Sequence, residues 1–274
     1  MKKKIVINWF RQDLRISDNP SLFSLSKYDL PILNIFIYDD VNCGEKKIGA
    51  ASKIWLHYAL IDLKNKLNGK LEVFKGCAKK IIKEFINEYD VHEISWNRCY
   101  EPWRIKRDIE IKSYLKREKI NVKTFNGSLL WEPMEILKSD GTPYKVFTPY
   151  FKKGCLNYKK PRIPIGLTNS TNFYSSNKKN TIDSLSLIPK KNWYRKFLKS
   201  WDISEVGMKK KQDSFFKNGI KDYKEGRNHP NKKNVSQLSP FIHWGQISPN
   251  ILWYKCVDLN SDENVDIFKS ELGW

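Results

Sequence analysis

Residues 5–9 have the sequence Ile5-Val6-Ile7-Asn8-Trp9, an apolar run of the kind that forms a buried β-strand. Similar runs follow at 32–38, 71–74, 93–96 and 122–125, and segments with helical periodicity separate them. Helix-length connections between successive strands require right-handed crossovers, which place the strands parallel to one another. The sequence therefore predicts an α/β fold, a doubly wound parallel five-stranded sheet with helices on both faces.

The helices of this part are expected at 20–26, 50–67, 78–89 and 103–119. Pro20 suits the first turn of a helix, and Asp18 and Asn19 before it are candidates to cap that turn. In such a sheet the ligand crevice lies beyond the carboxyl ends of the strands, which makes residues 9–15 the place to look. No glycine-rich fingerprint occurs there, so a standard dinucleotide or P-loop site is not expected.

The pattern changes twice along the chain. Residues 1–128 hold the strand-type runs and are expected to form the α/β domain. Residues 129–191 are expected to be an interdomain connector, because 139–143 predicts a turn and 167–180 is rich in Ser, Thr and Asn. From 192 to 274 apolar residues recur at helical spacing, which predicts a helical part with helices starting near Pro240, Pro249 and Asn264.

The chain is strongly basic, with 50 Lys and Arg against 30 Asp and Glu and a formal charge of +20. A field of this sign concentrates polyanions, so nucleic acid is the leading partner. The alternative is an AT-rich coding bias, which would spread lysine over the surface without any binding purpose.

Several protein classes are not expected from this sequence. The start of the chain has no signal-type apolar core, and no apolar run is long enough to cross a bilayer. The five cysteines are scattered, without a metal-ligand spacing, which is typical of reduced thiols in the cytoplasm. The four histidines show no catalytic spacing, so hydrolytic chemistry and a metal site are not expected.

Two short segments carry chemistry of interest. In 234–240 two hydroxyls precede a helix start at Pro240, where free amides suit a phosphate group, although an ordinary serine cap is the alternative. Glu271 and Trp274 lie three residues apart on the last expected helix. A carboxylate beside an indole could hydrogen-bond to and stack on a base, and the alternative is a surface Glu next to a core Trp.

Several segments, in this order along the chain, together resemble the photolyase/cryptochrome family. They are WFRQDLRISDNP (9–20), YEPW (100–103), GTPYKVFTPY (141–150), YKEGRN (223–228), SQLSP (236–240), GQISP (245–249) and ELGW (271–274). Among its members the chain resembles a class I cyclobutane pyrimidine dimer photolyase that is truncated at the carboxyl terminus.

The resemblance implies a deoxyribodipyrimidine photo-lyase, in which reduced FAD donates an electron to a cyclobutane pyrimidine dimer in DNA after blue-light excitation. It implies an antenna chromophore, of folate or deazaflavin type, in the amino-terminal domain and a flavin domain that starts within 192–274. The implied FAD contacts, chiefly to its phosphates, are Tyr223, Ser236, Gln237, Leu238 and Ser239. Glu271 and Trp274 would contact the dimer, and no residue of the chain is assigned a catalytic role.

The departures from the family pattern matter for function. Gln237 stands where the family usually has Arg or Lys, so one cation near the flavin diphosphate is expected to be lost. The family's later helices would follow Trp274, and we expect the 274-residue chain alone to be inactive unless a separate chain supplies them. The alternative functions are a cryptochrome-like blue-light photosensor and a non-catalytic antenna or DNA-binding remnant.

Overall fold

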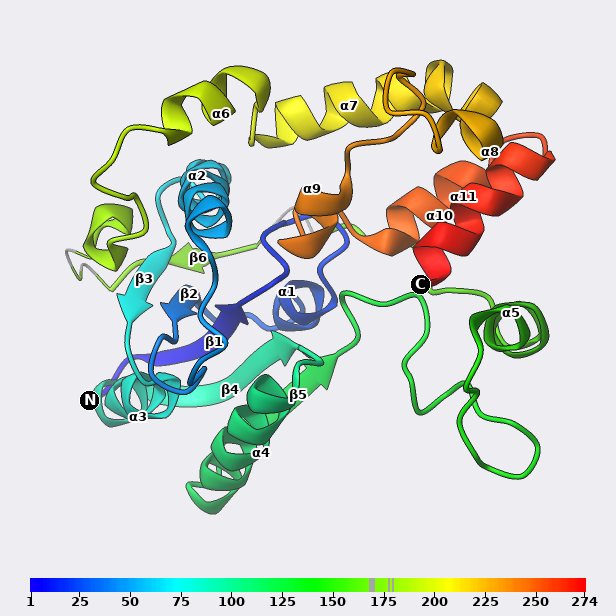
Figure 1. Cartoon of the computed structure of the whole chain (residues 1–274). Coiled ribbons are helices and arrows are strands. Elements are labelled where there is room, and N and C mark those ends of the chain that lie inside the picture. Colours follow the sequence, from blue (N-terminus) through cyan, green and yellow to red (C-terminus); the bar gives the residue numbers. More distant parts are fainter. Residues whose placement is uncertain (168–170, 177, 179) are drawn as a thin grey trace.

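The computed structural model describes residues 1–167, 171–176, 178 and 180–274, and its first half is built on a parallel sheet (Figure 1). The strands lie in the order β3-β2-β1-β4-β5 and pair in parallel. Their bounds are β1 Lys4–Phe10, β2 Ile32–Tyr38, β3 Glu72–Lys75, β4 Asp90–Asn97 and β5 Asn121–Phe125. The order reverses between β1 and β4, as in a doubly wound sheet, so the predicted fold class is confirmed.

Helices cover both faces of the sheet because the side chains of β1 alternate between two cores. Val6 and Phe10 pack with α1 and α2, whereas Ile7 and Trp9 pack with α3 and α4. The helices are α1 Pro20–Leu25, α2 Ala50–Lys66, α3 Ala78–Glu88 and α4 Pro102–Arg117, all close to the predicted bounds. Asn19 caps α1 by accepting from the Leu22 amide, as the sequence indicated.

The connector contains one strand that the sequence did not predict. This strand, β6 Phe173–Tyr174, pairs in parallel with β2, and Ser176 donates from its amide and its hydroxyl to the buried carboxylate of Glu72. The turn predicted at 139–143 is present, since the Gly141 amide donates to the carbonyl of Lys138 at 3.0 Å. The short helices of this segment are α5 Phe147–Pro149, the π-helix η1 Tyr150–Gly154 and the 3-10 helices η2 Cys155–Asn157 and η3 Ile182–Leu185.

The elements after residue 192 are helices, as predicted (Figure 1). They are α6 Tyr194–Ser200, α7 Glu205–Lys217, the 3-10 helix η4 Gly219–Asp222, α8 Tyr223–Gly226, α9 Ser239–His243, α10 Pro249–Val257 and α11 Glu263–Gly273. Met208 of α7 and Phe241 of α9 belong to the same apolar cluster as α1 and α2. The helical part therefore shares a core with the sheet. No helix in the described ranges is long and apolar enough to cross a membrane.

A buried loop after β1 joins the sheet, the connector and the helical part. The guanidinium of Arg15 donates to the carbonyls of Asp18, Gly127 and Gly245, at 2.8 to 3.1 Å for the first, 2.5 Å for the second and 2.9 Å for the third. The Asp18 carboxylate accepts from Arg162 of the connector at 2.6 Å and from the hydroxyl of Ser248. These contacts bring together segments more than 200 residues apart, so we name Arg15, Asp18, Arg162 and Ser248 the junction network.

Gly245 is the position at which the junction tolerates no side chain. Its φ is +66°, and a Cβ would overlap the carbonyl oxygen of Gln12 and the Cα of Asp13. We expect Gly245→Ala to lower the free energy of unfolding by about 2–4 kcal/mol, because left-handed strain and the backbone overlap act together. Urea unfolding followed by tryptophan fluorescence measures the loss. Gly49→Ala is the matched control, since its Cβ meets open space, and an equal effect of both changes would contradict the junction's tight fit.

The packing of α10 against α11 protects one thiol. Cys256 of α10 is buried with Val265 and Phe268 of α11, and burial raises the pKa of its thiol to about 12. Because the thiolate is the reactive form, iodoacetamide at pH 8 should modify the half-buried Cys77 well before Cys256. Peptide mass spectrometry over time measures both rates. Equal alkylation of the two cysteines would mean that α11 does not pack on α10.

Candidate cofactor and substrate sites

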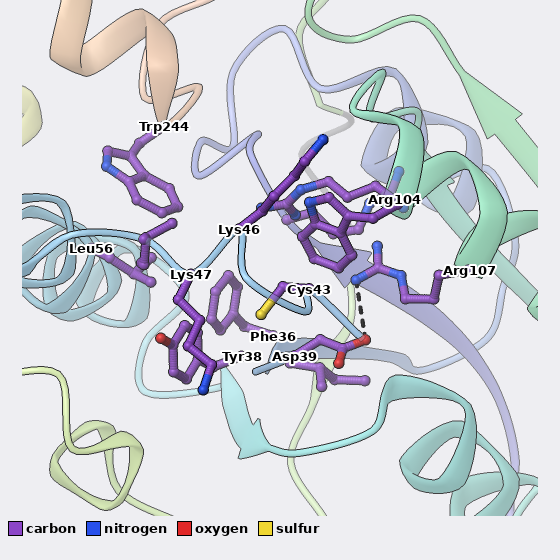
Figure 2. A pocket seen from close by; sticks show the side chains of 14 residues that line it. Phe36, Tyr38, Asp39, Cys43, Lys46, Lys47, Leu56, Arg104, Arg107 and Trp244 are labelled. Atoms are coloured by element: carbon purple, nitrogen blue, oxygen red, sulfur yellow. Dashed lines mark hydrogen bonds and ion pairs between the residues drawn. The ribbon is translucent and has the colours of Figure 1, made fainter. Parts of the chain in front are cut away.

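A cationic crevice lies beyond the carboxyl ends of β1 and β2, where the sheet topology places it (Figure 2). Figure 2 shows Trp244 on one side of the crevice and Arg104 and Arg107 on the other. The charged side chains that line it are one acid, Asp39, and five cations, Arg11, Lys46, Lys47, Arg104 and Arg107. We call this site the cationic crevice.

The deepest charges of the cationic crevice neutralise one another. Arg107 forms an ion pair with Asp39 at 3.4 Å, with both side chains nearly inaccessible to solvent. Arg11 donates to Asp108 and to the carbonyl of Asn97. Lys46 and Lys47, in the loop after β2, form no ion pair with a described residue. A ligand here would therefore meet a positive potential from the loop rather than from the buried pairs.

A larger hollow adjoins the crevice through Trp244, which lines both. The crevice has a volume of about 40 Å³, whereas the hollow has about 480 Å³. The rings of Trp55 and Trp201 meet edge to face with centroids 5.2 Å apart, and His243 lines the hollow beside them. Burial lowers the pKa of His243, which keeps its ring neutral near pH 7. We call this site the aromatic hollow, and it suits a flat, conjugated ligand.

The five residues predicted to contact FAD lie in three different environments. Tyr223 and Leu238 are buried in the core, and the Tyr223 ring lies edge to face with Phe268 at 5.3 Å. Ser239 lines the aromatic hollow. Ser236 and Gln237 line a third site, a groove of about 710 Å³ between α7 and the loop before α9. Four lysines line this lysine groove, Lys210, Lys211, Lys232 and Lys233.

The alternative of an ordinary serine cap in 234–240 is wrong, whereas Ser248, which also precedes a proline, does cap its helix. Helix α9 begins at Ser239, its cap is Leu238, and no side chain caps it. The hydroxyl of Ser236 instead accepts from the Leu238 amide at 3.3 Å. In α10, Ser248 is the cap and accepts from the Ile251 amide at 3.1 Å. The two Ser-Pro starts look alike in sequence, but Ser239 is the first residue of its helix and Ser248 is the residue before the first, where its hydroxyl also bonds to Asp18.

The two residues predicted to contact the lesion lie at the end of α11. Glu271 accepts an ion-paired hydrogen bond from Arg227, and its side chain is 37 % exposed, so it is a surface Glu as the alternative stated. Trp274, which caps α11, stacks on Phe147 of the connector with ring centroids 4.0 Å apart and planes 12° apart. Its exposed fraction is 78 %, so the alternative of a core Trp is wrong. The exposed indole face and the carboxylate both remain near the molecular surface.

Sequence reasoning missed the lysine groove and the partner of Glu271. Lys210 and Lys211 stand in a run of three lysines on α7, which by pattern indicates only a solvated helix face. Arg227 lies 44 residues before Glu271, and only the fold brings the two together. The one signal in the sequence was that Arg227 lies in the motif 223–228 together with Tyr223, whose ring its guanidinium faces at 5.8 Å.

Comparison with known proteins identifies relatives along the entire chain. Residues 6–165 match the family model for DNA photolyase. A deoxyribodipyrimidine photo-lyase of Agrobacterium fabrum is 30 % identical over 283 residues, which cover 100 % of this chain and 58 % of that protein. Cryptochrome-2 of Arabidopsis thaliana is 27 % identical over 293 residues, which cover 100 % of this chain and 47 % of the plant protein.

A solved photolyase structure has a similar backbone over the whole length of this chain. The crystal structure of a bacterial class III photolyase from Agrobacterium tumefaciens superimposes with a TM-score of 0.88 at 30 % identity, and the match covers 100 % of this chain and 58 % of that one. The chain therefore spans about half the length of the curated relatives it matches. The resemblance to class I members stays a prediction.

Proposed function

Because this chain belongs to the DNA photolyase family, we propose that it takes part in light-driven repair of cyclobutane pyrimidine dimers in DNA. The observation that carries the proposal is the match of the entire chain to the Agrobacterium photolyases, in sequence and in backbone. The formal charge of +20 supports DNA as the partner, since a positive surface releases counterions from the phosphates.

The contact with the dimer is proposed for the end of α11. Trp274 offers an exposed indole face, held by its stacking on Phe147, and such a face stacks on an extruded base with about 1–3 kcal/mol. Glu271 supplies a carboxylate whose position is fixed by Arg227. Together they provide a stacking surface and a hydrogen-bond acceptor for the polar edge of the lesion.

The flavin is proposed to bind with its phosphates in the lysine groove. The groove has the size of a cofactor site, and its lining includes four lysines and no acid. Reduced FAD, when bound, supplies the electron that opens the dimer. Ser236 and Gln237 line the groove, and the buried Tyr223 and Leu238 are proposed to complete the flavin site beside them.

The antenna chromophore is proposed for the aromatic hollow. The cationic crevice is too small for a folate or a deazaflavin with its present walls, but the adjoining hollow has a suitable volume. Trp55 and Trp201 would stack on the ring system, and Lys46 and Lys47 of the crevice would attract an acidic tail. The neutral His243 adds a hydrogen-bonding group without a charge.

A second chain that supplies further helices is also proposed. Large apolar side chains remain exposed around the end of α11, with Trp274 at 78 %, Val146 at 64 % and Leu156 at 50 %. Phe147, Phe151 and Ile267 line a groove of about 780 Å³ beside them. An apolar surface of this kind favours burial against another protein element.

The second candidate function is that of a cryptochrome-like blue-light photosensor or a non-catalytic DNA-binding remnant. The match to Arabidopsis cryptochrome-2 over the entire chain favours the photosensor as the alternative. Repair activity separates these functions, because a photosensor would respond to light without removing dimers.

The repair test uses the full chain reconstituted with FAD, with and without the unmatched carboxyl-terminal part of the Agrobacterium fabrum photolyase as a second chain. We expect light-dependent loss of dimers only when both chains are present, because this chain matches 58 % of the length of that photolyase. Alone, it should bind damaged and undamaged DNA similarly and lose affinity steeply with salt.

Trp274→Ala should weaken the preference of the two-chain mixture for dimer-containing DNA by about tenfold, since one stacking surface is lost. Trp193→Ala is the matched control, because Trp193 is exposed but lies at the start of α6, away from α11. Counting the remaining dimers measures repair, and electrophoretic mobility shift measures the preference for dimer-containing DNA. A light-induced spectral change without dimer loss in either mixture would favour the photosensor.

A further inference from the structure

The lysine groove holds a cation beside Gln237, the predicted FAD contact at which the family usually has Arg or Lys. Gln237 has a φ of +54°, and its amide oxygen accepts from the ammonium of Lys211 at 2.6 Å. The same ammonium lies 4.4 Å from the centroid of the Trp201 ring. Two contacts therefore hold the Lys211 ammonium beside the loop before α9, and neither of them neutralises its charge.

None of the described residues that line the groove is acidic, although Asp202 lies near enough to Lys210 to interact with it electrostatically. Lys210 and Lys233 line the same groove and form no ion pair with a described residue, and Lys232 is paired with Asp222 at 3.2 Å. Ammonium groups that share one groove repel one another, and a phosphate ligand would relieve this repulsion.

Hydroxyl and amide donors complete the groove. The Ser236 hydroxyl accepts from the Leu238 amide, and among the described residues its own proton meets no acceptor. Ser214, one turn after Lys210 on α7, and Asn218 line the opposite wall. Ammonium groups combined with neutral donors suit the several oxygens of a diphosphate better than the single carboxylate of an amino acid.

We propose that Lys211 binds the diphosphate of a dinucleotide in the lysine groove and replaces the charge that position 237 lacks. That the ligand is FAD rests on the flavin binding proposed above. That the ligand is a diphosphate ester rests on the residues that line the groove. When the ligand binds, the Lys211 ammonium donates to the phosphate oxygens, either in place of Gln237 or in addition to it, since an ammonium has three donors.

The test measures binding of FAD, ADP, pyrophosphate and riboflavin to the full chain by isothermal titration calorimetry. Lys211→Gln should weaken FAD, ADP and pyrophosphate by about tenfold, because one hydrogen bond to a charged group is lost, and leave any riboflavin binding unchanged. Lys209→Gln is the matched control, since Lys209 is the neighbour on α7, pairs with Glu205 and does not line the groove. Adding Gln237→Arg to Lys211→Gln should restore the affinity.

The outcomes separate this proposal from the proposed function. If the wild-type chain binds pyrophosphate and ADP with the Lys211 dependence but no flavin, the groove proposal stands and flavin binding by this chain fails. If FAD binds but Lys211→Gln and Lys209→Gln leave the same affinity as the wild type, Lys211 has no such role. Absence of binding by all three phosphate compounds would also overturn the proposal.

Discussion

The buried guanidinium of Arg15 is the interaction on which the arrangement of this molecule depends. Burying a cation is costly unless its donors are satisfied, and Arg15 meets this condition only when the remote carbonyls of Gly127 and Gly245 join the local carbonyl of Asp18. Burial lowers the pKa of Arg15, and the nearby Asp18 opposes that shift. The loop after β1, the end of the sheet domain at Gly127 and the turn at Gly245 must therefore form together.

This junction also fixes the places where ligands can bind. The turn at Gly245 holds Trp244 between the cationic crevice and the aromatic hollow. Trp55 donates its indole proton to Gln246 at 2.8 Å, which ties α2 to the same turn. The walls of both sites thus come from the sheet part and from the helical part. A change at the junction should therefore alter ligand binding at both sites.

The sequence predicted the sheet well because its strands carry the signal locally. In β1 and β2 nearly every side chain is buried, and the helices between strands begin at residues such as Asn19 and Pro20 that favour a helix start. Strand β6 was missed because two residues are too few for an alternating pattern, and it is held by Glu72 from another strand. Local pattern cannot reveal such a remote partner.

The candidate sites were less predictable for the same reason. The motif residues Ser236 and Gln237 could be identified from their order along the chain, but the charge that meets Gln237 comes from Lys211 on α7. Leu238 belongs to the same motif as these two residues and Tyr223 to the motif before it, and both of these side chains are buried. A motif therefore indicates which segment lies near a site, and the packing decides which of its side chains line the groove.

Hydrogen exchange of Arg15→Gln, compared with the wild type, tests most directly whether the junction couples the three parts. The account predicts that amides of the loop 11–19, the connector near 162–165 and the turn at 244–251 lose protection together, because the network links them. Loss of protection confined to residues 13–18, with the connector and the turn unchanged, would contradict it.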